Sequence, residues 1–338
     1  MYPEWLPGAL KPVAARLARV DDCYAEIADL SGQWSINALE LKQLRRSDDR
    51  VRTVVDTVRP IPPAISVLFS EAINHLRATL DNVVWHLVTS RSGPIDDRAA
   101  LSVALPIHGE AARFATWASK VRRQVPELGQ EGSTTYQRVK ALQPFIDSAR
   151  VPSEDATLAA LMGVELEEVH PLLLLQAYSN LDKHRAIALM VGRMMVTPLG
   201  FPFPAQDRFF REMGPGSAVG PDGVWGTPVP IESNAAVMVE RPAPWAAAVS
   251  PATEVMRLRD WVRHDALPYL VTGTREATPP VPVTVELSDD GRTMRERISA
   301  PNRTSGFERS SALIAERITA AEARPLKFAP VVNEEFDG

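Results

Sequence analysis

The stretch AISVLFSEAINHLRATLDNVVWHLVT, residues 64–89, decides the fold of this chain. Pro63 suits the first turn of a helix here, and Gly93-Pro94 suits its end. The apolar side chains recur at steps of three and four residues, so they share one face of that helix. We therefore predict a long amphipathic helix at the centre of the core, with an apolar stripe formed by Phe69, Ile73, Leu76, Leu80, Val83, Val84 and Leu87.

Further helices are predicted from the same periodicity. Residues 12–46 repeat apolar side chains at three- and four-residue steps and indicate one long or two shorter amphipathic helices. Pro171 opens a strongly apolar stretch, which we expect to form a helix that ends near His184. Shorter helices are predicted at residues 114–121, at residues 134–142 and in a segment capped by Ser153 and running toward Met162.

Strands are expected mainly after the Pro171 helix. Residues 187–196 are rich in β-branched side chains and predict a buried strand, and residues 235–239 predict another. A short strand is expected at residues 208–213, and a helix from Thr253 through Leu270. The valine-rich residues 51–58 receive no assignment.

Together these elements predict an α+β fold. An antiparallel helical bundle core occupies residues 1–185, because short connections between amphipathic helices favour antiparallel neighbours. A small C-terminal β-sheet with a flanking helix is expected in residues 186–272. Residues 273–338 have low aromatic content and many turns, which predicts an extended, partly disordered tail. Within it we expect one strand at residues 281–287 and one helix at residues 308–323.

Composition excludes several function classes. The chain has 338 residues, and its 37 Lys and Arg against 42 Asp and Glu give a net charge of −5, so there is no overall basic character. Cys23 is the single cysteine, which excludes an intramolecular disulfide or a cysteine metal cluster and favours a cytoplasmic location. No apolar run approaches the roughly 20 residues of a membrane helix, so no membrane association is expected.

The predicted central helix also carries a polar seam. Asn74, Arg77 and Asp81 follow one another at steps of three and four, and Asn82 and His86 lie beside them. One interpretation is a binding site along this seam. The alternative is an ordinary Arg77–Asp81 pair on a solvated surface, worth a few tenths of a kcal/mol.

A second polar cluster ends the predicted Pro171 helix. Asn180 and His184 are four residues apart and face the same way, and Lys183 and Arg185 flank them. Cations at a helix C-terminus are stabilised by the helix dipole without any functional demand. An imidazole and a guanidinium at one turn are also able to combine proton transfer with anion stabilisation.

Other site classes lack their signatures. There is no glycine-rich phosphate loop, no His-Glu-x-x-His and no Gly-x-Ser-x-Gly. His75, Asp81, His86 and His184 are the only grouping considered for a metal, and no local spacing fixes their geometry. We therefore predict neither a metal nor a cofactor.

The two polar blocks carry a resemblance. The pattern Leu-Arg-x-x-Leu-Asp-x-x-x-Trp at residues 76–85, Leu-Gln-Pro-Phe at residues 142–145 and Asn-x-Asp-Lys-His-Arg at residues 180–185 resemble an uncharacterised bacterial family. The first block of that family is similar to the Arg-x4-His signature of HEPN-type helical ribonucleases. The resemblance implies an RNA partner and a homodimer, in which Arg and His of two subunits assist attack of a ribose 2′-hydroxyl on the adjacent phosphate without metal.

This sequence departs from that signature at one position. Asn82 stands where the signature has His, and an amide does not exchange a proton near neutral pH. His86 lies one further turn along. The resemblance therefore gives candidate catalytic residues and candidate substrate-binding residues: for catalysis Arg77, His86 and His184, and for substrate binding Asn74, Asp81, Asn82, Asn180, Lys183 and Arg185.

Two functions from different classes follow. The first is an RNA-binding or RNA-cleaving HEPN-like homodimer with a degenerate motif. The second is a non-catalytic binding or scaffolding protein whose polar blocks are structural. Burial of Arg77 against Asp81 or a backbone carbonyl would favour the second, whereas an open cleft shared with His86 or His184 would favour the first. In either case we predict that the two polar blocks are neighbours in space, because both helices bury their apolar faces in one core.

Overall fold

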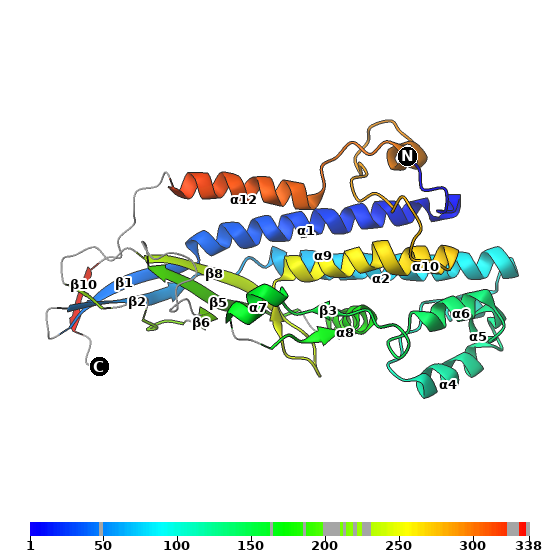
Figure 1. Cartoon of the computed structure of the whole chain (residues 1–338), viewed down its shortest axis with the longest axis horizontal. Coiled ribbons are helices and arrows are strands. Elements are labelled where there is room, and N and C mark those ends of the chain that lie inside the picture. The colour runs from blue at the N-terminus through cyan, green and yellow to red at the C-terminus, as the bar shows by residue number, and fades with distance from the viewer. Residues whose placement is uncertain are drawn as a thin grey trace.

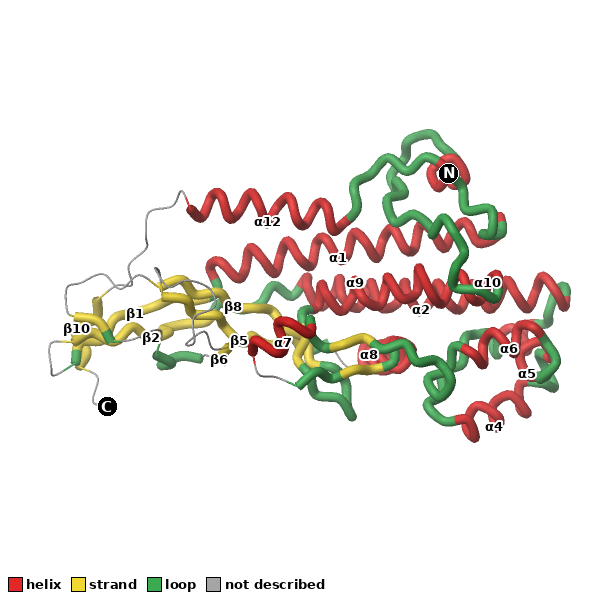
Figure 2. Tube along the Cα trace, viewed as in Figure 1, coloured by secondary structure: helices red, strands yellow, loops and turns green. Residues whose placement is uncertain are grey.

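A computed structural model gives the fold of the chain (Figure 1). Long helices run lengthwise through the molecule, and the larger sheets gather at one end (Figure 2). The fold is α+β, as predicted. The structure describes residues 1–46, 50–162, 165–184, 187–198, 210–211, 214–218, 222–224, 231–322 and 331–335.

The helical core is formed by α1 (Lys11–Asn37), α2 (Ala64–Ser92), α8 (Pro171–His184) and α9 (Pro251–Trp261). Helices α1 and α2 run antiparallel along each other, and α2 also contacts α8 and α9. The predicted apolar stripe of α2 is confirmed, since every member is buried. Phe69 meets Tyr178 of α8 edge to face with ring centroids 5.0 Å apart. Burying each such large side chain stabilises the fold by about 1.5–3 kcal/mol.

Short helices cover one end of α2. They are α3 (Asp97–Ala100), α4 (Ala111–Val121), α5 (Pro126–Gly129) and α6 (Thr134–Ala141). A separate 3-10 turn (Gly8–Leu10) precedes α1 at the start of the chain. The predictions at residues 114–121 and 134–142 are thus confirmed. Helices α4 and α5 approach closely at Gly129, where a Cβ would lie 2.5 Å from backbone atoms of Arg122.

The first sheet corrects the prediction for residues 12–46. Helix α1 ends at Asn37, and β1 (Leu39–Arg45) follows as a strand. It pairs antiparallel with β2 (Arg50–Val58), the segment left unassigned. The leucines of residues 39–45 lie at positions 39, 41 and 44, and steps of two and three over so short a run do not separate a strand from a helix. The sheet order is β10-β1-β2-β7, with β7 at Gly223–Val224 and β10 at Val331–Glu335.

The second sheet follows α8. The predicted end of that helix at His184 and the strand after it are confirmed by β5 (Leu189–Pro198). Strand β5 pairs antiparallel with β8 (Ile231–Glu240), which contains the strand predicted at residues 235–239. The order is β6-β5-β8-β9, in which β6 is Phe210–Arg211 and β9 is Ala248–Val249. Residues 208, 209, 212 and 213 of the predicted short strand lie outside the described residues.

Two helices differ from the prediction, one at its start and one in its middle. Ser153 does not cap α7 (Ala156–Met162); its hydroxyl accepts the N–H of Glu167, and Asp155 accepts the N–H of Thr157 at 2.9 Å. The helix predicted from Thr253 to Leu270 contains a π turn (Val262–Ala266) before α10 (Leu267–Thr272). Pro268 lacks the N–H that an α-helix would donate to the carbonyl four residues earlier, which favours the wider turn.

The segment after Thr272 docks on the helical core, so the prediction of an extended tail is wrong for its described part. Val281, Val283 and Val285 are buried although residues 281–287 form no strand, and Ile298 of α11 (Met294–Ser299) is fully buried. Helix α12 (Gly306–Glu322), predicted at residues 308–323, lies along α1. Ion pairs hold α12 to α1, and the apolar content of the sequence does not predict such pairs.

Two small strands complete the fold. Strands β3 (Val151–Pro152) and β4 (Glu168–Val169) pair antiparallel beside α8. Among the described residues, no helix has the combination of length and apolar character that crossing a membrane requires.

Candidate functional site

The polar seam of α2 is held by the loop that follows α3. The Nη2 atom of Arg77 donates to the carbonyl of Leu105 and lies 3.4 Å from Oδ1 of Asp81. The same Asp81 oxygen accepts the N–H of Leu105 at 2.9 Å. Burial lowers the pKa of Arg77, and Asp81 supplies the countercharge. The predicted Arg77–Asp81 pair is therefore present, and it fastens the Leu105 loop to the helix.

We predict that Asp81→Ala lowers the free energy of unfolding by about 1–3 kcal/mol, because it leaves the Leu105 N–H without its acceptor and the Arg77 guanidinium without its countercharge. The larger loss expected for a fully buried pair does not apply, since the Arg77 and Asp81 side chains are 18% and 30% exposed. Denaturant unfolding measures the change. Glu110→Ala, which removes an exposed partner of Arg113, should cost less than about 1 kcal/mol. Equal losses in the two variants would contradict the role of the Arg77–Asp81 pair in holding the Leu105 loop.

The two polar blocks meet in space, as predicted. Nδ2 of Asn74 donates to Oδ2 of Asp182 at 3.0 Å, where α2 contacts α8. Asn180 accepts from Gln176 one turn earlier at 2.9 Å, and Lys183 is exposed. The side chain of His184 and all of Arg185 lie outside the described residues. The contact between the blocks thus joins the amide of Asn74 to the carboxylate of Asp182.

The helix separates Arg77 from His86 within one chain. Nine residues turn an α-helix by two and a half turns, which places these side chains on opposite faces, about 13 Å apart along the axis. Asn82 and His86 are both half-buried, and burial lowers the pKa of His86, so the imidazole is neutral near pH 7. The single composite site expected from Arg77, Asp81, Asn82 and His86 is therefore not formed within one chain.

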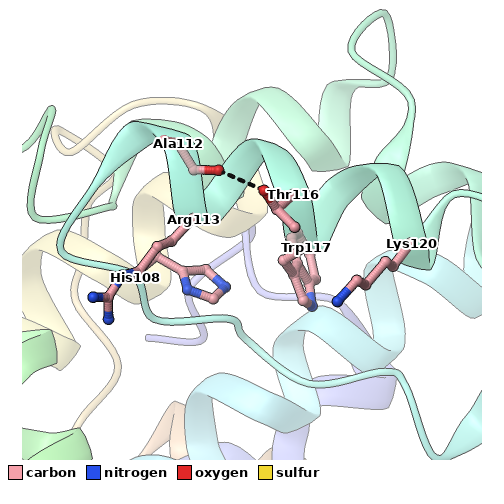
Figure 3. Close-up of a pocket in the computed structure, with 6 residues that line it drawn as sticks. All are labelled: His108, Ala112, Arg113, Thr116, Trp117 and Lys120. Carbon is pink, nitrogen blue, oxygen red and sulfur yellow. Dashed lines mark hydrogen bonds between the residues drawn. The ribbon is translucent and has the colours of Figure 1, made fainter.

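A different surface gathers aromatic and cationic side chains. It is a cavity of about 560 Å³ on the outer side of α4, which we call the α4 face (Figure 3). Trp117 packs against His108, with ring centroids 6.0 Å apart, and against Phe114 at 5.4 Å. Burial lowers the pKa of His108, as does Arg113 nearby. The α4 face is lined by His108, Ala112, Arg113, Thr116, Trp117 and Lys120.

One of the blocks in the family resemblance positions this face. Gln143 is fully buried, and its Oε1 accepts the N–H of His108 at 3.0 Å. Its Nε2 donates to the carbonyls of Pro106 and Val139 at 2.9 and 3.0 Å. The bonds to His108 and Pro106 fix the loop that carries His108, and the bond to Val139 holds the amide against α6. Phe145, two residues on, packs on Phe114 with centroids 5.8 Å apart.

The cations of the α4 face are solvated. Arg113 pairs only loosely with Glu110, at 3.5 Å with side chains 73% and 64% exposed, and Lys120 is exposed. Arg122 and Arg123 are exposed at the end of the same helix. Our sequence reasoning treated residues 114–121 only as a helix. The available signal was four cations within eleven residues around one tryptophan.

Comparisons with models of protein families, with curated proteins and with solved structures find no match to this chain. Within the described residues, no three His, Cys, Asp or Glu side chains group where they could hold a metal ion.

Proposed function

We propose that this protein binds single-stranded RNA on the α4 face and does not cleave it through Arg77. The observation that carries the proposal is the combination of a tryptophan, an imidazole and two solvated cations around one cavity. Proteins that bind single strands combine a positively charged groove with aromatic rings on which bases stack. The resemblance to HEPN-type proteins independently favours RNA.

The parts of the α4 face have separate tasks in this proposal. Trp117 stacks on a base, because its ring borders the cavity beside His108. Arg113 and Lys120 contact phosphates, and a neutral His108 accepts or donates a hydrogen bond at a base edge or a 2′-hydroxyl. No contact in this set reads a full base pair, so the expected ligand is an unpaired strand.

The non-catalytic part of the proposal rests on α2. The Arg77 guanidinium is engaged by the Leu105 carbonyl and Asp81, and Asn82 replaces the histidine of the signature. These observations favour the structural interpretation of the polar blocks. A homodimer remains part of the proposal because the resemblance implies one, and its molar mass by light scattering is the check. A cytoplasmic location is proposed from the single cysteine.

The test is fluorescence anisotropy with a short labelled oligouridine. We expect Trp117→Ala to weaken binding by about 1–3 kcal/mol, the value of one stacked base. The double variant Arg113→Gln/Lys120→Gln should reduce the slope of log K against log salt by about 1.4, since each phosphate contact on a single strand contributes about 0.7. Neither substitution removes a buried group that holds the fold, because both cations are exposed.

A matched control separates this surface from general charge. Arg98→Gln/Arg295→Gln removes two exposed cations elsewhere and should leave the salt slope unchanged. Loss of binding in Lys183→Gln, but not in the α4 variants, would instead move the RNA to the polar block at residues 180–185. Cleavage of the RNA that Arg77→Ala abolishes would overturn the non-catalytic assignment, and no binding at all would favour a scaffolding protein.

A further inference from the structure

A second cavity lies between β3 and the helix that carries the π turn. Its volume is about 500 Å³, within the range of small-molecule sites. Segment 148–152 forms one wall, and the opposite wall comes from α9 and the π turn. Its charged and aromatic lining consists of Arg150, Arg257 and Arg275, the carboxylates Asp260 and Asp265, and the rings of Trp261 and His264.

Two of these arginines have no carboxylate partner among the described residues. Nη1 of Arg150 donates to the carbonyl of Ala149 at 2.7 Å, and Nη1 of Arg257 donates to the carbonyl of Pro152 at 2.5 Å. Backbone carbonyls fix the positions of these side chains without neutralising their charge. The remaining guanidinium N–H groups keep donors for a ligand, because each guanidinium has five.

The other charged side chains of the cavity form ion pairs with one another or with residues behind it. Arg275 lies 2.8 Å from Oδ1 of Asp147 and 3.4 Å from Asp265. Burial alone would raise the pKa of Asp147, but interactions with His170 and Arg275 lower it to about 2, so this carboxylate is ionised. Asp260 pairs with Arg259 at 2.8 Å. Arg150 and Arg257 are therefore the two arginines of the cavity that form no ion pair in the described part of the chain.

Segment 148–152, whose carbonyls anchor both arginines, is itself held from behind. At one end Asp147 is held by Arg275 and by His170, whose Nε2 lies 3.5 Å from the carboxylate. At the other end the fully buried Arg241 donates to the carbonyls of Val151 and Pro152, each at 3.2 Å. A ligand that binds here meets guanidinium groups whose backbone anchors do not need to move, which lowers the cost of binding.

The cavity also borders an unpartnered donor. Trp261 lines it and is 7% exposed, and its indole N–H is buried without a hydrogen-bond acceptor in the described part of the chain. A buried donor of this kind costs about 1–3 kcal/mol unless an acceptor is supplied. Its ring gives the cavity an apolar wall beside the two cations.

We infer that this cavity binds a small phosphate monoester. Such a group carries close to two negative charges at neutral pH, and the cavity offers it two guanidinium groups that form no ion pair in the described residues. Arginine binds phosphate through paired N–H donors, and the carbonyls that anchor the two side chains, those of Ala149 and Pro152, belong to one short segment. The body of the ligand lies against Trp261. This site is separate from the α4 face and does not depend on the RNA proposal.

Isothermal titration calorimetry with phenyl phosphate tests the inference. We expect binding to the unmodified protein, and at least a tenfold loss of affinity in Arg150→Gln and in Arg257→Gln. Glutamine retains an N–H for the backbone carbonyl, and unchanged melting temperatures show that the variants fold. Arg98→Gln, an exposed arginine on α3, is the matched control and should bind as the unmodified protein does.

The outcomes are distinguishable. Succinate bound more tightly than phenyl phosphate would replace the phosphate assignment with a dicarboxylate, and unchanged affinity in both arginine variants would place the phosphate elsewhere. No heat of binding in a folded protein would remove the site altogether. Because labelled RNA on the α4 face should not be displaced by phenyl phosphate, failure of one proposal does not decide the other.

Discussion

Arg241→Ala is expected to lower the free energy of unfolding by about 3–5 kcal/mol, the cost of leaving a buried charge without its partner. Both side chains of the pair are fully buried, and the Arg241 guanidinium donates to both oxygens of Glu254 at 2.9 and 3.0 Å. The hydroxyl of Tyr178 donates to the same carboxylate at 3.3 Å. Denaturant unfolding followed by circular dichroism measures the loss.

Two comparisons show whether the loss comes from the stranded charge. Arg59→Ala removes an arginine whose contact with Glu40 is 3.9 Å long and about half exposed, so it should cost less than about 1 kcal/mol. Replacing both members, as Arg241→Met/Glu254→Leu, should recover much of the stability, because well-packed apolar residues often replace a buried pair at little cost. A single variant as stable as the unmodified protein would contradict the account.

Arg241 also bears on the phosphate site. Its Nη2 atom holds the carbonyls of Val151 and Pro152, and Pro152 is the anchor of Arg257. We therefore expect Arg241→Ala to weaken binding of phenyl phosphate even under conditions where the variant remains folded. The buried pair thus links the stability of the fold to the geometry of one cavity wall.

The helices were predictable because their signal is local. Phe69 and Ile73, with the other stripe residues of α2, repeat every three or four positions, and nothing distant is needed to interpret them. Strand β1 was not predictable in this way. Its partners are β2 and also β10, where Val331 pairs with Gln43 from the far end of the chain. Strand β2 follows β1 closely in the sequence, but β10 does not, and the apolar residues of β1 do not by themselves distinguish a strand from a helix.

The candidate sites differ in the same way: those that depend on local spacing were predictable, and those that only the folded chain brings together were not. The Arg77–Asp81 pair and the meeting of the two polar blocks followed from helical spacing and a shared core. The α4 face was missed because Trp117 sits at a position that also suits a buried helix face. The second cavity was beyond sequence reasoning altogether, since it joins Arg150 to Arg257 across about a hundred residues. Their lack of carboxylate partners is a property of the folded chain alone.

The last prediction concerns the docking of α12. Asp21 of α1 is 1% exposed, accepts the N–H of Gly306 at 2.6 Å and pairs with Arg259 at 2.5 Å. Asp21→Ala should lower the free energy of unfolding by about 3 kcal/mol, because it leaves two buried donors without an acceptor. Arg259 retains Asp260, which keeps the loss below that expected for Arg241→Ala. Limited proteolysis should then cut α12 first.

Gly306→Ala tests the same contact from the other side. A Cβ at Gly306 would lie 2.4 Å from the backbone oxygen of Asp21, too close for the helix to stay in place. Gly132→Ala is the matched control, since nothing lies within 4 Å of a Cβ there. If α12 resists protease equally in all three variants, its docking rests on the pairs of Arg309 and Arg317 with Asp22 and Asp29 instead. Early cutting in both test variants would locate the anchor at Asp21, where the first turn of α12 touches α1.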